Sequence, residues 1–342
     1  MSESTPTDTV SEPQIVEKVS EATAPEPASK DTAAEAIDTV TAPEPSDVTE
    51  PTRTTPTIPE ATAEEEDDEP QNDLTAKFTA DEWKALKEFR TQLPEIFGKA
   101  YHPEDFSVKA ESIKLWGVTV DPHAPKDDAR VSVLLMKFLR ARNLDVAQAH
   151  EMLLATLKWR QDFGIEAIMA EKFDDAIFGK LGFVVGHDKE DRPVNYNLYG
   201  GQDIKVVFSD VPRFIRWRVQ LMERSIELLD FEKVDQMVQI HDYAGVSLFT
   251  GRDPNQKAAA AEATNIFQNH YPEFLSIKFF LNVPTVLTWI FWLFKPLMSA
   301  KTLAKMNIVG TSKSAIASAL LPIIDETELP KRYGGKADDL VE

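Results

Sequence analysis

The sequence predicts an α/β fold, in which a sheet is covered by helices. Between about residues 79 and 163, apolar residues recur at spacings of three and four, which is typical of helices. From about residue 173, short runs rich in β-branched and aromatic residues alternate with further helical patterns. An acidic stretch with neither pattern precedes both regions, so we expect three parts: 1–73, 74–165 and 166–342.

The first 73 residues differ in composition from the remainder. They hold 20 acidic and 3 basic residues, 10 of the 22 prolines and no aromatic residue. Such a segment buries too little apolar surface to offset its ordering entropy, so we predict a disordered acidic tail. The rest of the chain carries 34 basic and 37 acidic side chains, so the net charge of −20 describes mainly the tail.

Several functional classes are disfavoured by composition. The chain begins without a basic segment followed by an apolar one, so we expect no secretory signal. The absence of cysteine excludes disulfides, zinc thiolate sites and iron–sulfur clusters, and it fits a cytoplasmic protein. No basic stripe interleaved with aromatic residues is present, so we expect no nucleic-acid partner.

A small helical module is expected first. Thr79 can cap a helix, and Glu82 stands three residues later, where it can reach back to the cap. Two further helices are predicted from Asp128 to Arg142 and from Asp145 to Phe163. These helices make up the module over 74–165.

The remaining chain is predicted to form one sheet of about four to six strands with covering helices. Two strands should surround a turn at His187–Arg192. Further strands are read in "QMVQIHDYAGVS", "SIKFFLNV" and "MNIVG". The helical stretches are "SDVPRFIRWRVQLMERSIELLDF", "PNQKAAAAEATNIFQNHY", Thr285–Leu297, "SAKTLAK" and "SKSAIASALLPII".

The most apolar stretch is "FFLNVPTVLTWIFWLFKPLM" at Phe279–Met298. Asn282, Pro284 and Lys295 interrupt it, so its apolar helical part is shorter than the roughly 20 residues that span a bilayer. Its aromatic residues suit either a buried core helix or a surface that meets lipid. These residues are Trp289, Phe291, Trp292 and Phe294.

The usual signs of an enzyme are absent from the sequence. It has no Gly-x-Ser-x-Gly elbow, no His-Glu-x-x-His, no phosphate-binding glycine loop and no dinucleotide fingerprint. We therefore predict that the protein is not an enzyme.

Three stretches resemble the CRAL-TRIO lipid-binding family, in matching order. They are "KFLRARNLDVAQAHEMLLATLKWRQDFG" from Lys137, "HYPEFLSIKFFLNVPTVLTWIFWLFKPLMSAKTLAKMNIVG" from His270, and "LPKRYGG" from Leu329. The resemblance implies a mixed sheet that floors an apolar cavity and a helix, Thr285–Leu297, that closes the cavity and opens at a membrane. Trp289, Phe291, Trp292 and Phe294 would be gate residues. The implied ligand is phosphatidylinositol, and the implied membrane contact is peripheral.

The resemblance also suggests residues for the lipid headgroup. In members that bind phosphatidylinositol, an Arg, a Glu, a Thr and a Lys contact the inositol phosphate, and they match Arg142, Glu273, Thr302 and Lys305. Arg and Lys provide charge-assisted bonds to phosphate, while Glu and Thr can bond inositol hydroxyls.

"QIHDYAGVS" departs from the usual family pattern. In a strand, residues two apart share a face, so His241 and Tyr243 should point one way and Asp242 the other. Burying these rings without partners would cost about 2 kcal/mol or more each. The alternative is that both are core residues bonded to the backbone or to Arg218.

The His-Asp-Tyr triplet resembles a fungal subgroup of phosphatidylinositol transfer proteins that binds haem. The resemblance implies ferric haem b with Tyr243 on the iron, His241 beside it, and Arg218 and Lys278 at the propionates. Arg142 stands where the haem-binding relative has a Tyr, so it could serve haem or inositol phosphate.

We therefore expect an atypical phosphatidylinositol transfer protein that contacts the endoplasmic reticulum or other intracellular membranes from the cytoplasm. Its role would lie in phosphoinositide homeostasis or oxidant stress. One alternative is a haem-dependent redox or stress sensor without lipid transfer. Another is a membrane-associated interaction protein that recruits partners through its acidic tail.

Overall fold

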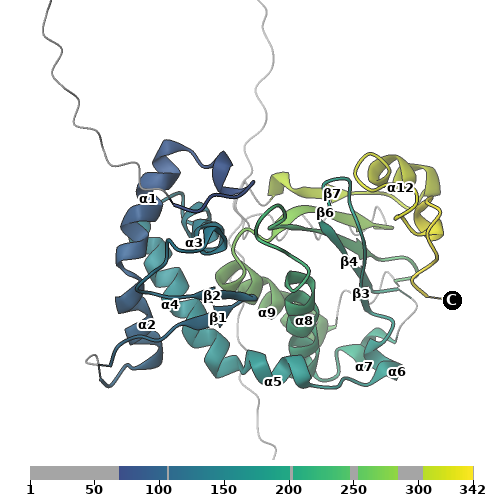
Figure 1. Cartoon of the computed structure of the whole chain (residues 1–342). Helices are drawn as coiled ribbons and strands as arrows, with labels where there is room; N and C mark the ends of the chain where they lie inside the picture. Colours follow the sequence, from purple (N-terminus) through teal and green to yellow (C-terminus); the bar gives the residue numbers. More distant parts are fainter. Residues whose placement is uncertain (1–68, 106–107, 201–202, 247–252, 284–302, 342) are drawn as a thin grey trace, which may run out of the picture. The chain divides into compact units, whose positions relative to one another are not determined.

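The computed structural model describes residues 69–105, 108–200, 203–246, 253–283 and 303–341 (Figure 1). The predicted α/β fold is confirmed, because a five-stranded sheet follows a helical module and is covered by helices. Among the described residues, no helix is long and apolar enough to cross a membrane.

The helical module begins with the cap predicted at Thr79. The Thr79 side chain accepts from the Glu82 amide, and the Glu82 carboxylate accepts from the Thr79 amide. The two later helices also occur, capped by Asp128 and Asp145. The elements of the module are η1 (Thr75–Lys77), α1 (Ala80–Thr91), α2 (Leu93–Tyr101), β1 (Ile113–Leu115), β2 (Val118–Val120), α3 (Ala129–Ala141) and α4 (Val146–Phe163).

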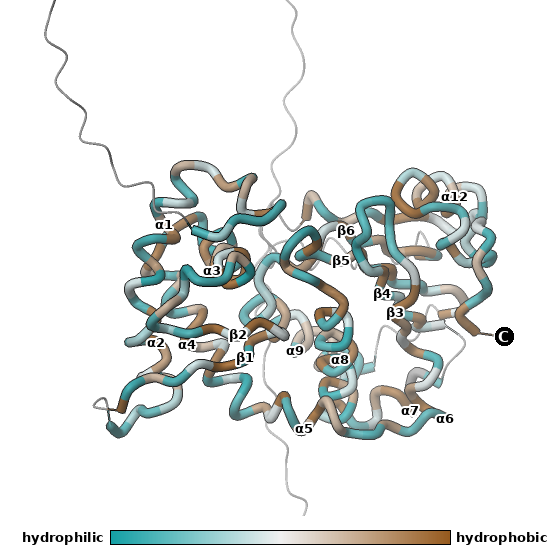
Figure 2. The backbone as a smooth tube through the Cα atoms, in the orientation of Figure 1, coloured by the Kyte–Doolittle hydropathy of each residue, from teal (hydrophilic) through white to brown (hydrophobic). Residues whose placement is uncertain are grey.

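Three parts of the module were not predicted: the short helix η1, helix α2 and the hairpin of β1 and β2. The helices of the module mix hydrophilic and hydrophobic residues along their length (Figure 2), as expected for helices with one buried face. Their apolar sides form a core that includes Leu86, Phe89 and Phe138.

The folded unit begins before residue 74, where we had placed the boundary. Glu69 accepts two hydrogen bonds of 2.8 Å from the Arg90 guanidinium, and both side chains are buried. Asn72 donates to the Phe231 carbonyl at 2.9 Å. Residues 69–73 are therefore attached to the folded unit rather than to the predicted tail.

The main sheet has the strand order β3-β4-β5-β6-β7, with β3 and β4 antiparallel and the other neighbours parallel. Its five strands agree with the predicted four to six. The strands are β3 (Gly182–His187), β4 (Pro193–Leu198), β5 (Met237–Asp242), β6 (Leu275–Leu281) and β7 (Met306–Ile308). The other elements are α5 (Ile165–Ala170), α6 (Asp175–Phe178), α7 (Ile204–Val207), α8 (Val211–Ile226), α9 (Pro254–His270), α12 (Lys313–Leu320) and η5 (Lys331–Tyr333).

The two faces of the sheet contact different helices (Figure 1). One face packs on α12 and the chain that follows it, through an apolar cluster that includes Tyr196, Ile240 and Leu320. The other face meets α8. There Gly182 allows a close approach, because a Cβ at this position would lie 2.4 Å from the end of the Leu221 side chain. We call the first the closed face and the second the open face.

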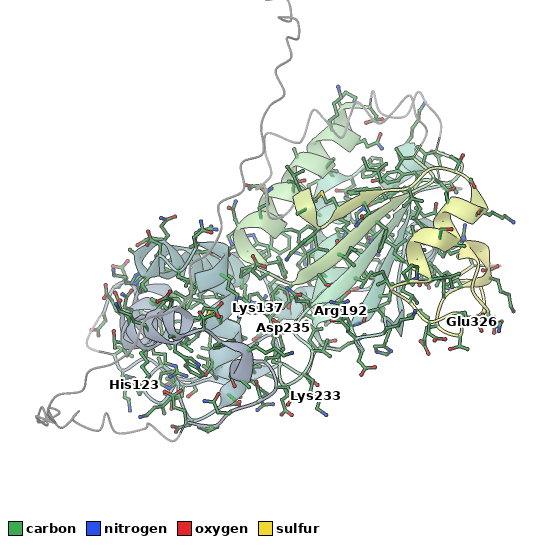
Figure 3. The ribbon with its side chains drawn as sticks, turned by 90° about the horizontal axis from the view of Figure 1, so that it is seen from above. His123, Lys137, Arg192, Lys233, Asp235 and Glu326 are labelled. Carbon is green, nitrogen blue, oxygen red and sulfur yellow. The ribbon has the colours of Figure 1, made fainter. Side chains whose placement is uncertain are left out.

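A buried lysine joins the module to the sheet. Lys137 of α3 is 2% exposed, and its ammonium donates to the Asp235 carboxylate at 2.8 Å and to the Asp235 carbonyl at 2.6 Å (Figure 3). It also donates to the Glu273 carbonyl at 3.2 Å and lies 4.4 Å from the centre of the Phe274 ring. Burial lowers the pKa of Lys137, and Asp235 opposes this shift.

Candidate functional site

The candidate site lies on the open face, where β5 ends. His241 and Tyr243 are two residues apart, and their rings belong to one aromatic cluster, as the alternation of strand side chains predicted. His241 is buried, and its Nε2 has no hydrogen-bond partner. Tyr243 is partly buried.

Two further rings complete the aromatic cluster. The Tyr199 ring stacks on that of Tyr243 at 5.2 Å between centres and lies 5.5 Å from that of His241. From β6, the Phe280 ring lies 5.6 Å from His241 and 6.4 Å from Tyr243. Sequence reasoning did not identify Tyr199.

Asp242, between the two rings, points to the closed face. Its carboxylate accepts from the Tyr333 hydroxyl at 2.8 Å, from the Asn282 amide group at 2.7 Å and from the Ala244 backbone amide at 2.9 Å. The stretch "LPKRYGG" therefore contributes Tyr333 as an anchor for the end of β5. The Asp242 side chain holds the chain in place on the closed face, and the Asp242 backbone carbonyl accepts from the Tyr199 backbone amide at 2.9 Å.

Two cations belong to the open face. Arg218 of α8 is 4% exposed, it lies beside the Tyr199 hydroxyl, and its Nη1 has no hydrogen-bond partner. Lys278 of β6 is partly buried, with its ammonium 5.2 Å from the centre of the Phe280 ring. The structure thus brings together Arg218, Lys278, His241 and Tyr243, as the resemblance implied.

Burial and these cations control the ionisation of the cluster. Burial, and then the neighbouring Arg218, lower the pKa of Lys278 to about 7. Burial, followed by Lys278 and Arg218, lowers the pKa of His241 well below its usual value, so this imidazole is neutral at pH 7. Burial raises the pKa of Tyr243, with Tyr199 adding to the rise, while the charge of Arg218 acts in the opposite direction.

The strands below the cluster are more polar than the apolar cavity floor that we expected. Asn195 and Asn197 of β4 are fully buried and alternate with Val194, Tyr196 and Leu198, which face the closed side. In register, Asn195 pairs with Gln239 and Asn197 pairs with His241. The alternation in "PVNYNL" was a signal that sequence reasoning could have used.

The predicted headgroup residues are brought together only in part. Lys305 and Glu273 form an ion pair of 3.1 Å, and Lys305 also donates to the Leu275 carbonyl at 2.6 Å. Glu273 has a φ of 54°, in the left-handed region, and its carbonyl accepts from Lys137 and from Gln236. Such strained positions occur often at ligand sites. Thr302 lies outside the described residues.

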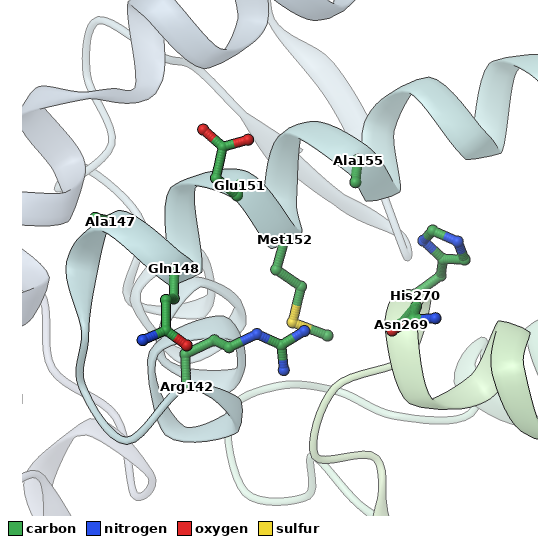
Figure 4. A pocket seen from close by; sticks show the side chains of 8 residues that line it. All are labelled: Arg142, Ala147, Gln148, Glu151, Met152, Ala155, Asn269 and His270. Atoms are coloured by element: carbon green, nitrogen blue, oxygen red, sulfur yellow. The ribbon is translucent and has the colours of Figure 1, made fainter.

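Arg142 lies elsewhere, at the end of α3. Its Nη1 donates to the Ala141 carbonyl at 3.1 Å. It lines a surface hollow of about 560 Å³ between α4 and α9 (Figure 4), together with residues that include Met152, Asn269 and His270. This hollow is separate from the aromatic cluster, which contains the orphaned His241 nitrogen.

The predicted gate cannot be placed against the site. Trp289, Phe291, Trp292 and Phe294 all lie outside the described residues, as does the rest of the predicted helix Thr285–Leu297. Among the described residues, no group of three or more His, Asp or Glu side chains could hold a metal ion by itself.

Comparisons with known proteins agree with this architecture. A family model described as "CRAL/TRIO domain" matches residues 178–335, and one described as "CRAL/TRIO, N-terminal domain" matches residues 85–155. A solved structure described as "Crystal structure of Sfh5" is 28% identical with a TM-score of 0.64, over 76% of this chain and 89% of that chain.

Named fungal relatives are also similar over the folded part. The "Phosphatidylinositol transfer protein sfh5" of Sclerotinia sclerotiorum is 39% identical over 75% of this chain and 62% of its own length. The protein of that name in Cryptococcus neoformans var. neoformans is 37% identical over 75% of this chain and 88% of its own length. The matched part of this chain spans about three-fifths of the first relatives, at 56–62% of their length.

Proposed function

Because this chain belongs to the CRAL/TRIO domain family, we propose that it is a carrier that transfers phosphatidylinositol between membranes. The names of its fungal relatives support this ligand. The observation in the structure that carries the proposal is the Glu273–Lys305 pair. An ammonium suits the phosphate, and a carboxylate can accept bonds from inositol hydroxyls.

Transfer requires no covalent step. Burial of acyl chains provides roughly 25 cal/mol per Å² of apolar surface, and the bilayer offers a similar apolar environment. The carrier therefore exchanges its lipid at a membrane surface without an external energy source. We propose that the protein makes peripheral contact, from the cytoplasm, with the endoplasmic reticulum or another intracellular membrane.

The test is lipid transfer between donor and acceptor vesicles by the full chain. Lys305→Ala removes the phosphate-binding charge, and Glu273→Gln removes the carboxylate while keeping its shape. We expect each change to slow phosphatidylinositol transfer about tenfold, the loss of one charge-assisted bond. Lys331→Ala is the control, because its ion pair with Asp338 is exposed. Equal transfer by all four proteins would contradict the proposal.

A second candidate function, binding of ferric haem b, is favoured by the aromatic cluster and its cations. His241 and Arg218 each have a buried nitrogen without a partner, and a phenol and an ammonium lie beside them. Imidazole and phenolate are donors that ferric haem accepts, and two cations suit its two carboxylates. The residues present therefore fit the group.

In this proposal, each residue has a separate role toward haem. Tyr243 would hold the iron, and the Arg218 charge favours the phenolate form that such a bond requires. His241, neutral at pH 7, would lie beside the iron ligand, and Arg218 and Lys278 would hold the carboxylates. Bound haem would add an iron centre capable of one-electron redox chemistry. Oxidant stress is a role consistent with such a centre.

Titration with haemin, followed by the Soret band, tests the ligand assignment. We expect Tyr243→Phe to weaken binding tenfold or more and to shift the band. Tyr196→Phe removes a phenol hydroxyl from the closed face, so it should leave the haemin affinity and the position of the Soret band unchanged. An unshifted Soret band in Tyr243→Phe would reject Tyr243 as the ligand.

The two alternatives from sequence each make a prediction that differs from that of a lipid carrier. A dedicated haem sensor would bind haemin but transfer no lipid. A protein that acts through its acidic tail would lose function when the tail is deleted and keep it when the open face is altered. That deletion should end at residue 68, because Glu69 and Asn72 contact the folded unit.

A further inference from the structure

Three buried polar atoms without partners belong to one part of the open face. They are Asn197 Oδ1, His241 Nε2 and Arg218 Nη1, half of the six such atoms in the described part of the chain. Asn197 is paired in register with His241, and Tyr199 contacts His241 while lying beside Arg218. The three side chains are 0%, 6% and 4% exposed. Buried polar atoms are nearly always bonded, so a partner for this group is missing.

The free atom of Asn197 is an obligate acceptor. The Ser225 hydroxyl donates its single hydrogen to the Leu221 carbonyl at 2.7 Å, so toward Asn195 it can only accept. Asn195 must then present its NH₂ group to Ser225, at 2.6 Å, and its oxygen to Asn197. Asn197 in turn donates its NH₂ group to that oxygen at 2.8 Å. Because the NH₂ group of Asn197 points toward Asn195, its Oδ1 points away from Asn195 and has no donor.

A single partner shared by these atoms would have to both donate and accept. Asn197 Oδ1 requires a donor, and Arg218 Nη1 requires an acceptor. The neutral imidazole of His241 can provide either, depending on its tautomer. An acyl chain does neither, and an ester or a carboxylate only accepts. A hydroxyl group does both.

We propose that Asn197, His241 and Arg218 form a subsite for a hydroxyl group on the buried part of an apolar guest. The proposal rests on the proposed carrier function, and it adds a further class of guest, an apolar molecule with a hydroxyl group, which neither the acyl chains of phosphatidylinositol nor haem b provides. Asn197 is then a specificity-determining residue. The hydroxyl could come from the guest or from an ordered water molecule, and the experiment distinguishes the two.

The probes are decanol and decyl methyl ether, which share the oxygen and the decyl chain but differ in the O–H donor. Calorimetric titration of the full chain should show decanol binding about tenfold more tightly, the effect expected for one satisfied buried acceptor. In Asn197→Leu the preference should fall to about one, with ether binding retained. Retained ether binding also shows that the variant folds. Tyr196→Phe, on the closed face of the same strand, should keep the preference.

Several results would overturn the subsite. Equal binding of alcohol and ether by the wild-type protein would do so, as would a water molecule bonded to Asn197 in a crystal structure grown with decanol. A preference that persists in Asn197→Leu, or in Asn197→Ala if the first variant does not fold, would also do so. Phosphatidylinositol transfer is measured on the same preparations. Its absence counts against the proposed function alone, because the alcohol-to-ether ratio is independent of it.

Discussion

The two faces of the central sheet come from the same strands and differ in how their polar groups are bonded. On the closed face, Asp242 accepts three hydrogen bonds amid an apolar cluster. On the open face, Asn197, His241 and Arg218 each keep a buried atom without a partner. Successive side chains of a strand point to opposite faces, so one strand can place different residues on each face.

This difference separates stability from binding. A satisfied buried carboxylate stabilises the fold, and its loss leaves several donors unpaired. Unpaired polar atoms reduce stability unless a guest bonds them. Three such atoms belong to the open face, whereas the closed face has the Tyr196 hydroxyl, so the group of three indicates where the guest binds. Substitutions on the closed face should therefore lower stability, whereas substitutions on the open face should change guest binding.

The largest expected effect is on stability, at Asp242. Asp242→Ala leaves the Tyr333 hydroxyl and the Asn282 amide without their acceptor, and it should lower the free energy of unfolding by about 3 kcal/mol. His241→Leu, one residue earlier, removes an unpaired nitrogen and should change the unliganded protein by less than about 1 kcal/mol. Urea unfolding of both variants checks this. Equal losses would show that the faces do not differ.

The next largest effect is a pH dependence of haemin binding that is caused by the titration of Lys278. Its pKa of about 7 in the free protein is low because of burial and of Arg218. A bound carboxylate raises that pKa, so binding takes up a proton and haemin affinity should fall as pH rises above 7. The nearby groups do not titrate in this range, because the pKa of His241 is lowered and that of Tyr243 is raised. Arg218 stays charged.

Two variants isolate this effect. Lys278→Arg keeps its charge, so its haemin affinity should be nearly constant between pH 6 and 9, whereas Lys278→Met should bind weakly at every pH. Spectroscopic titration across this range measures the wild-type loss, which we expect to approach tenfold. A wild-type profile as flat as that of Lys278→Arg would remove Lys278 from the site.

The smallest effect concerns the closed face. The Tyr196 hydroxyl is buried there without a partner, and its ring is parallel to that of Tyr333 at 5.8 Å. Tyr196→Phe keeps the stacking and removes the unpaired group, so stability should change by less than about 1 kcal/mol. Thermal unfolding measures it, and a large loss would indicate that this hydroxyl has a bonded partner in solution.

Local chemistry made most elements predictable. The Thr79–Glu82 capping box and the Asp caps of α3 and α4 occupy only a few adjacent residues, so sequence alone determines them. The hairpin of β1 and β2 was not predicted. Its strands have three residues each, too few to show a period, and they are stabilised by packing on the module.

The site was predictable only where its residues are close in sequence. The placement of His241 and Tyr243 on one face follows from their spacing, and that of Arg218 and Lys278 followed from the resemblance. The position of Tyr199 beside them depends on the parallel register of β4 and β5, which no local pattern reveals. The position of Arg142 near Asn269 and His270 likewise depends on helix packing.

The central claim is that the open face holds a guest, and native mass spectrometry of the full chain tests it most directly. After incubation with haemin and with phosphatidylinositol vesicles, the wild-type protein should carry one additional mass equal to either guest. The haemin mass should disappear in Tyr243→Phe and persist in Tyr196→Phe. Wild-type protein that carries neither mass after both incubations would contradict the account.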